Sequence, residues 1–226
     1  LHDTIKAYNP RVQFGISPFG VWRNKSQDPS GSATQAGQTN YDDLYADVLH
    51  WIEEGWLDYV APQIYWHIGF KAADFQVLLD WWSRQAPNIN LYIGQGIYRV
   101  GREEEKEWQR RRYFLEQIER IRQNPVADGS MFFSERVFKD NPRRVTNVIG
   151  RRFYDYPALP PKIPSMKKLP SKAPNSLWLK KTNEGQFLEW TGYQENKLYV
   201  IYRFKGEEIG SLKNPENIFT ITNAPG

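Results

Sequence analysis

Residues 57–70 read LDYVAPQIYWHIGF, and this stretch decides how the rest of the chain is interpreted. It begins as an apolar run rich in β-forming residues, which predicts a strand over residues 58–65. The run then ends in hydrogen-bonding and flat aromatic side chains instead of a plain turn. Because a strand that serves only for packing commonly ends at Gly, Asn or Asp, this ending indicates a strand end with a functional role.

The same combination of a β run and a helical pattern occurs four times along the chain. The β runs lie at residues 12–16, 58–65, 91–98 and 130–133. The helical patterns, with apolar side chains at helical spacing, lie at residues 41–54, 74–85, 103–122 and 141–152. Alternation of strands and helices predicts an α/β fold with a parallel sheet and right-handed crossovers. Four such units fit half of an eight-stranded barrel or a small doubly wound sheet.

A nucleotide-binding sheet is disfavoured, because its glycine pattern is incomplete. Gly94 and Gly96 flank Gln95, but the remaining glycine of a dinucleotide fingerprint is missing, and the chain has no phosphate-binding loop.

The last third of the chain changes in character. Residues 157–174 read PALPPKIPSMKKLPSKAP, which predicts an extended, Pro-rich and basic linker. Residues 175–226 contain short runs of β formers separated by turns, which predicts part of a β-sandwich. The predicted domains are therefore residues 1–156 and 175–226, joined by the linker.

The composition is that of an ordinary globular protein, except that aromatic residues are frequent. Of the 226 residues, 15% are aromatic, with nine Trp and thirteen Tyr. This excess indicates either a Trp-rich core or a surface that stacks on flat ligands or sugar faces, and the composition leaves both open. Residues 135–172 carry an excess of seven positive charges. They lack the Gly and aromatic spacing suited to bases, which favours solvated surface over a nucleic-acid site.

Several classes of site are excluded by residue content. The chain has no Cys, which excludes disulfides, thiolate metal sites and Cys nucleophiles. Its three His are scattered and accompany no acidic cluster, so no metal site and no cofactor are predicted. No run of about 18 apolar residues exists, so no membrane span is predicted.

Four longer motifs carry a family resemblance. They read VQFGISPFGVWRN, YDDLYADVLHWIEEGWLDYVAPQIYW, NLYIGQGIYRV and RRFYDYPALPP. Together they resemble the bacterial glycosyl-hydrolase-like family ten over most of residues 1–165. The resemblance implies a (β/α)8 TIM-type barrel assigned to glycoside hydrolysis, with some members linked to bacterial cell-wall glycans. It places SPFG near the fifth strand, so the chain is expected to be a fragment that holds strands five to eight.

The tail is similar to another known domain. LEW followed by YVIYRF is similar to the opening strands of a fibronectin type III domain. A complete sandwich of this kind needs about seven strands and about 100 residues. Residues 175–226 are expected to be a partial domain.

The barrel interpretation predicts where a substrate binds, because active sites of such barrels lie at the carboxyl ends of the strands. Side chains there combine amide, guanidinium and hydroxyl groups with flat rings, which suit sugar hydroxyls and pyranose C–H faces. The predicted sugar-binding residues are Trp22, Arg23, Gln63, Tyr65, Trp66, Gln95, Tyr98 and Ser134. The alternative is that the amides satisfy buried backbone groups and the rings pack under loops.

The catalytic groups are less well defined. Glycoside hydrolysis commonly uses two carboxyl groups, about 5–9.5 Å apart. Glu135 is the single acid at the predicted strand ends and only a weak candidate, since a loop carboxylate beside Arg136 explains it better. Asp42 and Asp43 suit the start of a helix. The resemblance implies that the catalytic acids end strand four, which the chain is expected to lack.

The sequence thus predicts a fragment of a glycoside hydrolase acting on a bacterial or dietary polysaccharide or a cell-wall glycan. The alternatives are a non-catalytic carbohydrate-binding barrel and a purely structural fragment. The resemblance implies an exported, periplasmic or cell-surface bacterial protein. Carbohydrate is the expected ligand, with no nucleic acid partner. The chain alone is expected to be inactive, and to self-associate or to pair with a missing N-terminal half.

Overall fold

The computed structural model describes residues 1–102, 105–155, 161, 163–164, 176–183, 185–191, 198–203 and 217–222. The chain divides into two compact units. The first unit comprises Leu1–Phe153 and Pro161–Met166, and the second comprises Tyr154–Pro160 and Lys167–Gly226. Most of the predicted linker, residues 157–174, lies outside the described residues.

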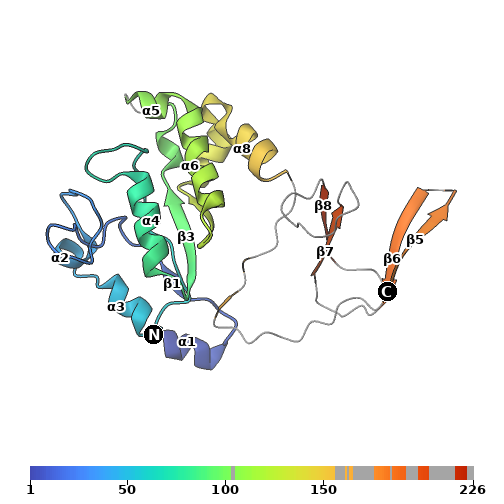
Figure 1. The fold of residues 1–226 in the computed structure, drawn as a ribbon, viewed down its shortest axis with the longest axis horizontal. Helices are drawn as coiled ribbons and strands as arrows, with labels where there is room; N and C mark the ends of the chain where they lie inside the picture. Colours follow the sequence, from blue (N-terminus) through green and yellow to red (C-terminus); the bar gives the residue numbers. More distant parts are fainter. Residues whose placement is uncertain are drawn as a thin grey trace. The chain divides into compact units, whose positions relative to one another are not determined.

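A four-stranded parallel sheet forms the centre of the first unit (Figure 1). Its strands, in spatial order, are β1 (Gly15–Ile16), β2 (Tyr59–Val60), β3 (Asn90–Gln95) and β4 (Ala127–Phe132). Isolated bridges from Gln63 to Phe19 and to Gly94 extend the pairing beyond β2. The mixed α/β fold with a parallel sheet is therefore confirmed, and it is consistent with part of a TIM-type barrel.

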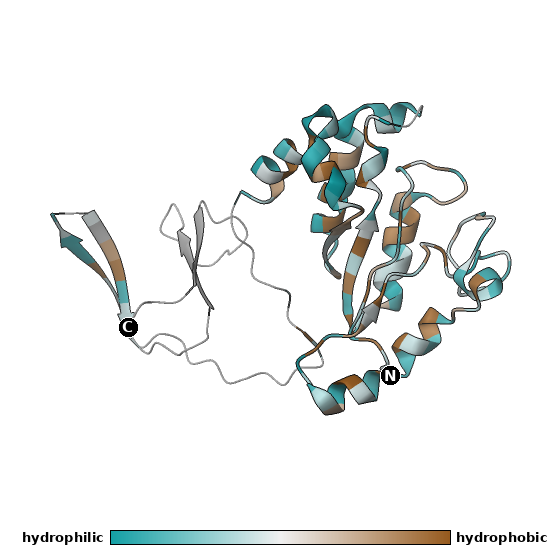
Figure 2. Cartoon of the chain, turned by 180° about the vertical axis from the view of Figure 1, so that it is seen from behind, coloured by the Kyte–Doolittle hydropathy of each residue, from teal (hydrophilic) through white to brown (hydrophobic). Residues whose placement is uncertain are grey.

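Helices cover one face of this sheet, and α4 (Phe75–Gln85) and α6 (Arg111–Gln123) run side by side along it (Figure 1). In Figure 2, hydrophobic residues colour the strands and the sheet-facing sides of the helices, whereas the outer sides are mostly hydrophilic. The other helical segments are α1 (His2–Tyr8), α2 (Asn40–Leu44), α3 (Val48–Glu53), η1 (Ile97–Arg99), α5 (Lys106–Gln109), α7 (Glu135–Asp140), η2 (Pro142–Arg144) and α8 (Val145–Phe153). None of the helices in the described part of the chain has the length and apolar character of a membrane span.

The helix α4 illustrates how the local sequence produces an element. The Asp74 side chain accepts a hydrogen bond from the Val77 amide at 2.9 Å, which satisfies a free donor at the helix start. Apolar side chains then recur at helical spacing and are buried against the sheet, namely Phe75, Leu78, Leu79, Trp81 and Trp82. The Trp82 indole N–H is satisfied by the Gly20 carbonyl at 2.8 Å.

Two predicted helices are each divided in the structure. The helix predicted at residues 41–54 is split into α2 and α3, because Tyr45 adopts a left-handed conformation with φ of 53°. The Asp47 side chain then caps the second piece by accepting from the His50 amide. The helix predicted at residues 103–122 is interrupted at Arg110, which is extended. Apolar periodicity continued across both breaks, so it could not locate them.

Other predicted boundaries were also inaccurate. β2 ends at Val60 instead of residue 65, and Tyr98 lies in the turn η1 instead of in β3. β4 begins at Ala127, three residues earlier than predicted. The helix α7 was not predicted, and α8 begins at Val145, after η2. Polar residues at the strand ends form turns and bridges there instead of regular ladders.

An ion pair fixes α1 to the base of the sheet. Lys6 Nζ lies 2.7 Å from Asp58 Oδ2, and the Phe14 amide donates to the same oxygen at 2.7 Å. The Asp58 side chain is almost completely buried, so its charge requires these partners. The start of β2 thereby holds both α1 and the segment that leads into β1.

In the second unit, strands pair in an antiparallel manner. β5 (Ser176–Thr182) pairs with β6 (Gly185–Thr191), and β7 (Leu198–Arg203) pairs with β8 (Asn217–Thr222). These pairs are two separate two-stranded sheets. The partial β-sandwich therefore stays a prediction.

Leu79→Ala tests the packing of α4 on the sheet. Leu79 is completely buried, so truncation should lower the free energy of unfolding by about 2–5 kcal/mol. Urea unfolding followed by circular dichroism measures the change. Asp80→Ala, on the exposed side of the same helix, is the control and should change the value by about 0.5 kcal/mol or less. Equal losses in the two variants would contradict this packing.

Candidate functional site

Three aromatic rings meet where β2, β3 and β4 end, and we call Tyr65, Tyr98 and Phe133 the aromatic cluster. Tyr65 stacks on Phe133 with ring centroids 6.0 Å apart and an interplanar angle of 25°. Tyr98 contacts both rings edge-on, at 6.1 Å from Tyr65 and 6.0 Å from Phe133. The structure thus brings together two of the predicted site residues with one that was not predicted.

Backbone contacts between neighbouring strand ends position the cluster. The Phe133 amide donates to the Gln95 carbonyl at 2.9 Å, and the Tyr98 amide donates to the Phe133 carbonyl at 3.3 Å. Gly96 allows the close approach, because a Cβ there would lie 3.2 Å from the Tyr65 side chain.

Arg99, in the turn η1 after β3, holds the segment that follows β2. Its Nη1 donates to the Tyr65 carbonyl at 2.7 Å, and its guanidinium carbon lies 5.0 Å from the Trp108 ring centroid. A cation held by a ring and by a carbonyl is a rigid support. Arg99 therefore fixes the backbone that presents the Tyr65 ring.

The cluster is partly open to solvent. Phe133 is 56% exposed, whereas Tyr65 and Tyr98 are half-buried. Burial raises the pKa of the Tyr65 phenol, with a further contribution from Tyr98, so the hydroxyl stays protonated at neutral pH. The cluster offers flat apolar area and hydroxyl groups, which are the properties of a sugar-stacking surface.

Gln63 connects the ends of two strands. Its side-chain Nε2 donates to the Ser17 carbonyl at 2.9 Å, and its backbone amide donates to the Pro18 carbonyl at 2.9 Å. It also borders a shallow hollow of about 390 Å³ that includes Phe19 and Trp51. Gln63 thus lies at the predicted edge, but its amide nitrogen already serves the backbone after β1.

Gln95 faces the helix layer instead of the strand-end surface. It is completely buried, and its Nε2 donates to Gln117 Oε1 on α6 at 3.2 Å. Gln117 Nε2 in turn donates to the Trp66 carbonyl at 3.0 Å. This arrangement agrees with the alternative interpretation, in which the amides serve buried groups. The hydrogen bonds run from Gln95 through Gln117 to the backbone carbonyl of Trp66. The Gln95 Oε1 atom has no hydrogen-bond partner among the described residues.

Trp66 packs against other rings beneath the segment that follows β2. Its ring lies 5.3 Å from Phe19, edge-on, and 6.5 Å from Phe70, nearly parallel. It is half-buried against the main hydrophobic core. The indole therefore contributes packing area, and Phe70 occupies one of its faces.

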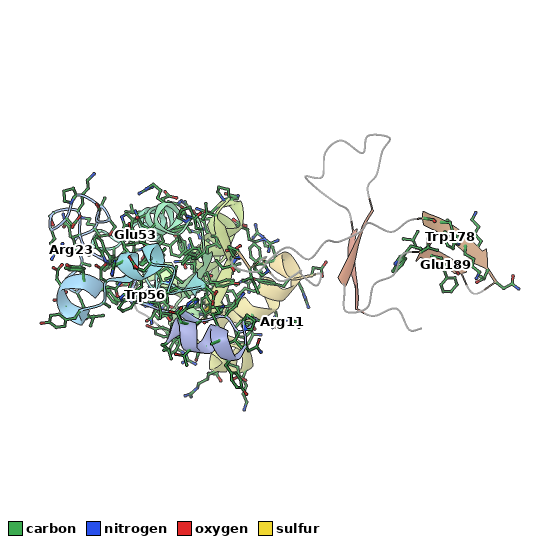
Figure 3. The ribbon with its side chains drawn as sticks, turned by 90° about the horizontal axis from the view of Figure 1, so that it is seen from below. Arg11, Arg23, Glu53, Trp56, Trp178 and Glu189 are labelled. Carbon is green, nitrogen blue, oxygen red and sulfur yellow. The ribbon has the colours of Figure 1, made fainter. Side chains whose placement is uncertain are left out.

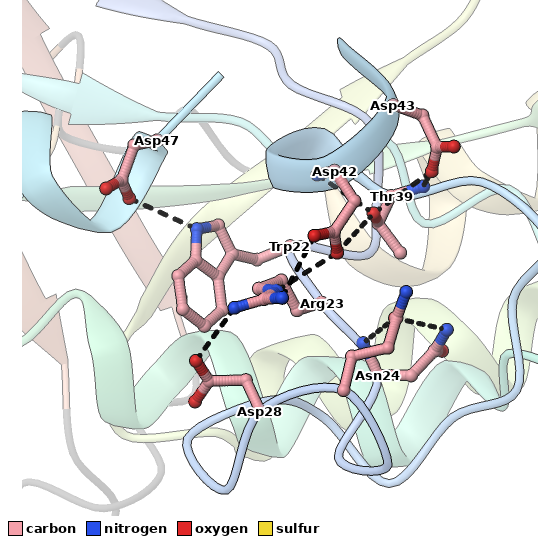
Figure 4. A network of polar contacts seen from close by, with 9 residues as sticks. Trp22, Arg23, Asn24, Asp28, Thr39, Asp42, Asp43 and Asp47 are labelled. Carbon is pink, nitrogen blue, oxygen red and sulfur yellow. Dashed lines mark hydrogen bonds and ion pairs between the residues drawn. The ribbon is translucent and has the colours of Figure 1, made fainter. Parts of the chain in front are cut away.

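Trp22 and Arg23 belong to a polar network that holds the loop after β1 (Figure 4). Trp22 is buried, stacks on Trp81 at 6.2 Å, and donates from Nε1 to Asp47 Oδ1 at 3.3 Å. Arg23 donates to both Asp42 oxygens at 3.0 and 2.9 Å and to Asp28 at 3.0 Å. The hydrogen bond with Asp42 raises the pKa of Arg23. Both side chains are thus engaged in holding the loop.

Most carboxylates near this edge have structural partners. Asp42 pairs with Arg23, Asp43 accepts from the Thr39 amide at 2.7 Å, and Asp47 and Asp74 cap helices. Such capping and pairing stabilise helix starts and explain these acids without catalysis.

Ser134 and Glu135 lie at the start of α7, next to the cluster. Ser134 precedes the helix and its carbonyl accepts from the Val137 amide at 3.0 Å, while Glu135 is exposed in the first turn. Within the described ranges, no three His, Asp or Glu gather closely enough to hold a metal ion.

Phe133 is the site residue that sequence reasoning missed. It follows β4 directly and shares its alternation with Met131, which is 39% exposed. Residues 130–133 were predicted only as a strand, and the candidate site residues were those that follow it, Ser134 and Glu135. Alternation alone would have placed Phe132 toward the helices, where it contacts Phe114, and Phe133 on the opposite face.

A parallel sheet with helices on one face is consistent with a partial TIM-type, glycosyl hydrolase-like fold. Residues 1–110 match the family described as Glycosyl hydrolase-like 10. The chain is 42% identical over 220 residues to Glycosyl hydrolase YngK of Bacillus subtilis. The aligned region covers 94% of this chain and 43% of that protein.

A second relative supports the same relationship. The chain is 51% identical over 100 residues to Glycosyl hydrolase DigH of Escherichia coli K12. The aligned region covers 43% of this chain and 23% of that protein. The chain spans less than half the length of these curated relatives. The family match and both relatives thus indicate similarity to glycosyl hydrolase-like proteins.

Trp66→Ala tests the packing role of this indole. Because the ring lies between Phe19 and Phe70, its loss should lower the free energy of unfolding by about 3 kcal/mol. Trp56→Ala, at a 45% exposed site, is the matched control and should cost about 1 kcal/mol or less. Chemical unfolding measures both values. An unchanged stability of Trp66→Ala would mean that the ring does not pack there.

Proposed function

We propose that this chain is part of a glycoside hydrolase and that it supplies sugar-binding strand ends to the active-site cleft. The observation that carries the proposal is the aromatic cluster, in which rings from three consecutive strand ends meet at the carboxyl edge of a parallel sheet. Pyranose C–H faces pack on such rings, and neighbouring hydroxyl and amide groups orient the sugar. The family match and the names of the relatives support the same reaction class.

The proposed substrate is a polymeric glycan, either a bacterial or dietary polysaccharide or a cell-wall glycan. Within this proposal the protein is exported and works in the periplasm or at the cell surface, where such polymers occur. Glu135 stays a weak candidate for a catalytic acid, and the chain alone is inactive because hydrolysis needs two suitably placed carboxyl groups.

A non-catalytic carbohydrate-binding barrel is the second candidate function. It is favoured by one observation: Asp42, Asp43, Asp47 and Asp74 serve as caps or ion-pair partners. Release of reducing ends from polysaccharides by the full-length protein separates the two candidates. Binding without any release would favour the non-catalytic barrel.

We further propose that the chain comprises residues 1–156 as half of the barrel, residues 157–174 as a linker and residues 175–226 as part of a fibronectin type III-like sandwich. The antiparallel pairing of β5 with β6 and of β7 with β8 supports a domain of the latter kind.

Phe133→Ala tests the sugar-binding role of the cluster. Phe133 is 56% exposed, so its truncation should change the stability little. The affinity of the chain for its soluble polysaccharide should fall by about tenfold. Affinity electrophoresis in gels that contain soluble polysaccharides measures the change. Phe138→Ala, on α7 and 43% exposed, is the matched control and should leave the affinity unchanged. Equal affinities of both variants and the wild type would count against the cluster.

The open face of the sheet predicts association of the isolated chain. Tyr59 and Tyr92 pair there at 5.7 Å, and Met131 and Phe133 are exposed on the same side. Exposed apolar area and unpaired strand edges recruit partners. We propose that the chain self-associates or binds the N-terminal half of a (β/α)8 barrel through this face. Light scattering at micromolar concentration should give a mass above 26.6 kDa. A stable monomer would rule out self-association.

A further inference from the structure

The hairpin of β5 and β6 has two faces of different character. The register pairs Trp178 with Glu189 and Lys180 with Phe187, so these four side chains share one face. The opposite face carries Leu179, Leu188 and Trp190, and is the apolar side suited to a core. The first face therefore combines two rings with a pair of opposite charges.

A defined set of polar contacts holds the first face together. Trp178 Nε1 donates to Glu189 Oε2 at 3.1 Å, and Lys180 Nζ donates to Glu189 Oε1 at 2.9 Å. Both carboxylate oxygens thus accept a hydrogen bond, and the edge of the indole ring is fixed. In Figure 3, Trp178 and Glu189 lie beside each other on the two strands of the hairpin.

The aromatic area of this face is available to a ligand. Trp178 is 43% exposed and Phe187 is 45% exposed. The hydrogen bond from Lys180 lowers the pKa of Glu189, with a smaller contribution from Trp178, so the side chain is ionised at neutral pH. An exposed ring with a fixed orientation, bordered by a strong donor and a strong acceptor, has the chemistry that recognises a sugar ring.

We propose that Trp178, Lys180 and Glu189 form a second glycan-binding platform, separate from the strand-end site of the first unit. A pyranose ring packs its C–H face on the indole of Trp178. Its hydroxyl groups hydrogen-bond to the Lys180 ammonium and to the Glu189 carboxylate. The choice of a polymeric glycan as ligand rests on the proposed function, whereas the platform itself rests on the contacts of the hairpin.

A purely structural role for Trp178 makes a different prediction. A cross-strand Trp–Glu hydrogen bond can stabilise the hairpin without any ligand. In that case the indole N–H matters and the exposed ring face does not. Trp178→Phe separates the two roles, because Phe keeps a flat ring but cannot donate to Glu189.

The experiment uses the full 226-residue chain and three probes: hydroxyethyl cellulose, glycol chitin and soluble arabinoxylan. Affinity electrophoresis should show that the wild type binds at least one probe. Trp178→Ala should weaken that binding by about tenfold, and Trp178→Phe should retain most of it. Trp56→Ala is the matched control, since Trp56 is 45% exposed in the first unit, and it should bind like the wild type.

Hydrogen exchange of the β5 and β6 amides shows whether each variant keeps the hairpin. An affinity lost in Trp178→Ala with unchanged exchange supports the platform. The proposal is overturned if the wild type binds none of the probes, if Trp178→Ala binds like the wild type, or if Trp178→Phe loses as much as Trp178→Ala. It is also overturned if Trp178→Ala changes the mass measured by light scattering while its affinity for the probes stays that of the wild type.

The outcome for the strand-end site is independent of this result. If Trp178→Ala weakens binding while Phe133→Ala does not, the platform stands and the strand-end site fails. The opposite pattern removes the platform and leaves the proposed function in place.

Discussion

Burial of one face of the parallel sheet beneath α4 is the interaction on which the first unit depends. Val60 from β2 and Ile93 from β3 are completely buried in the same core as Leu79 and Trp82 of the helix. Removal of this apolar area from water supplies the main favourable free energy of folding. Because the strands are parallel and short, the same contacts also bring their carboxyl ends to one edge.

Polar side chains at that edge are used mainly to hold the protein itself. Arg23 joins Asp28 of the loop after β1 to Asp42 of α2. Gln63 donates to the neighbouring backbone, and Gln95 lies within a buried amide chain. Hydrogen bonds of this kind fix the strand ends, because each gives a partner to a polar group that would otherwise lack one. In the proposed function, the ligand therefore contacts the exposed rings, above all Phe133.

The two proposed glycan surfaces differ in chemistry. The aromatic cluster offers flat apolar area with phenol hydroxyl groups, whereas the platform around Trp178 adds an ammonium and a carboxylate. Two weak sites in one chain can bind a polymer more tightly than either site alone, provided that the polymer reaches both. A repetitive polysaccharide presents the same sugar many times, so it suits such an arrangement.

The sequence by itself determined the order of strands and helices, the parallel sheet and the apolar face of α4, because each follows from local periodicity and capping. It also indicated that the ends of β2, β3 and β4 are unusual. Only the tertiary structure decided where their side chains point. Alternation applies within a regular strand, but β2 ends at Val60, and beyond it the path depends on contacts with neighbouring strands. Those contacts packed Trp66 against Phe70 and brought Tyr65 onto Phe133, whereas Gln95, the last residue of β3, follows the alternation of its strand toward α6.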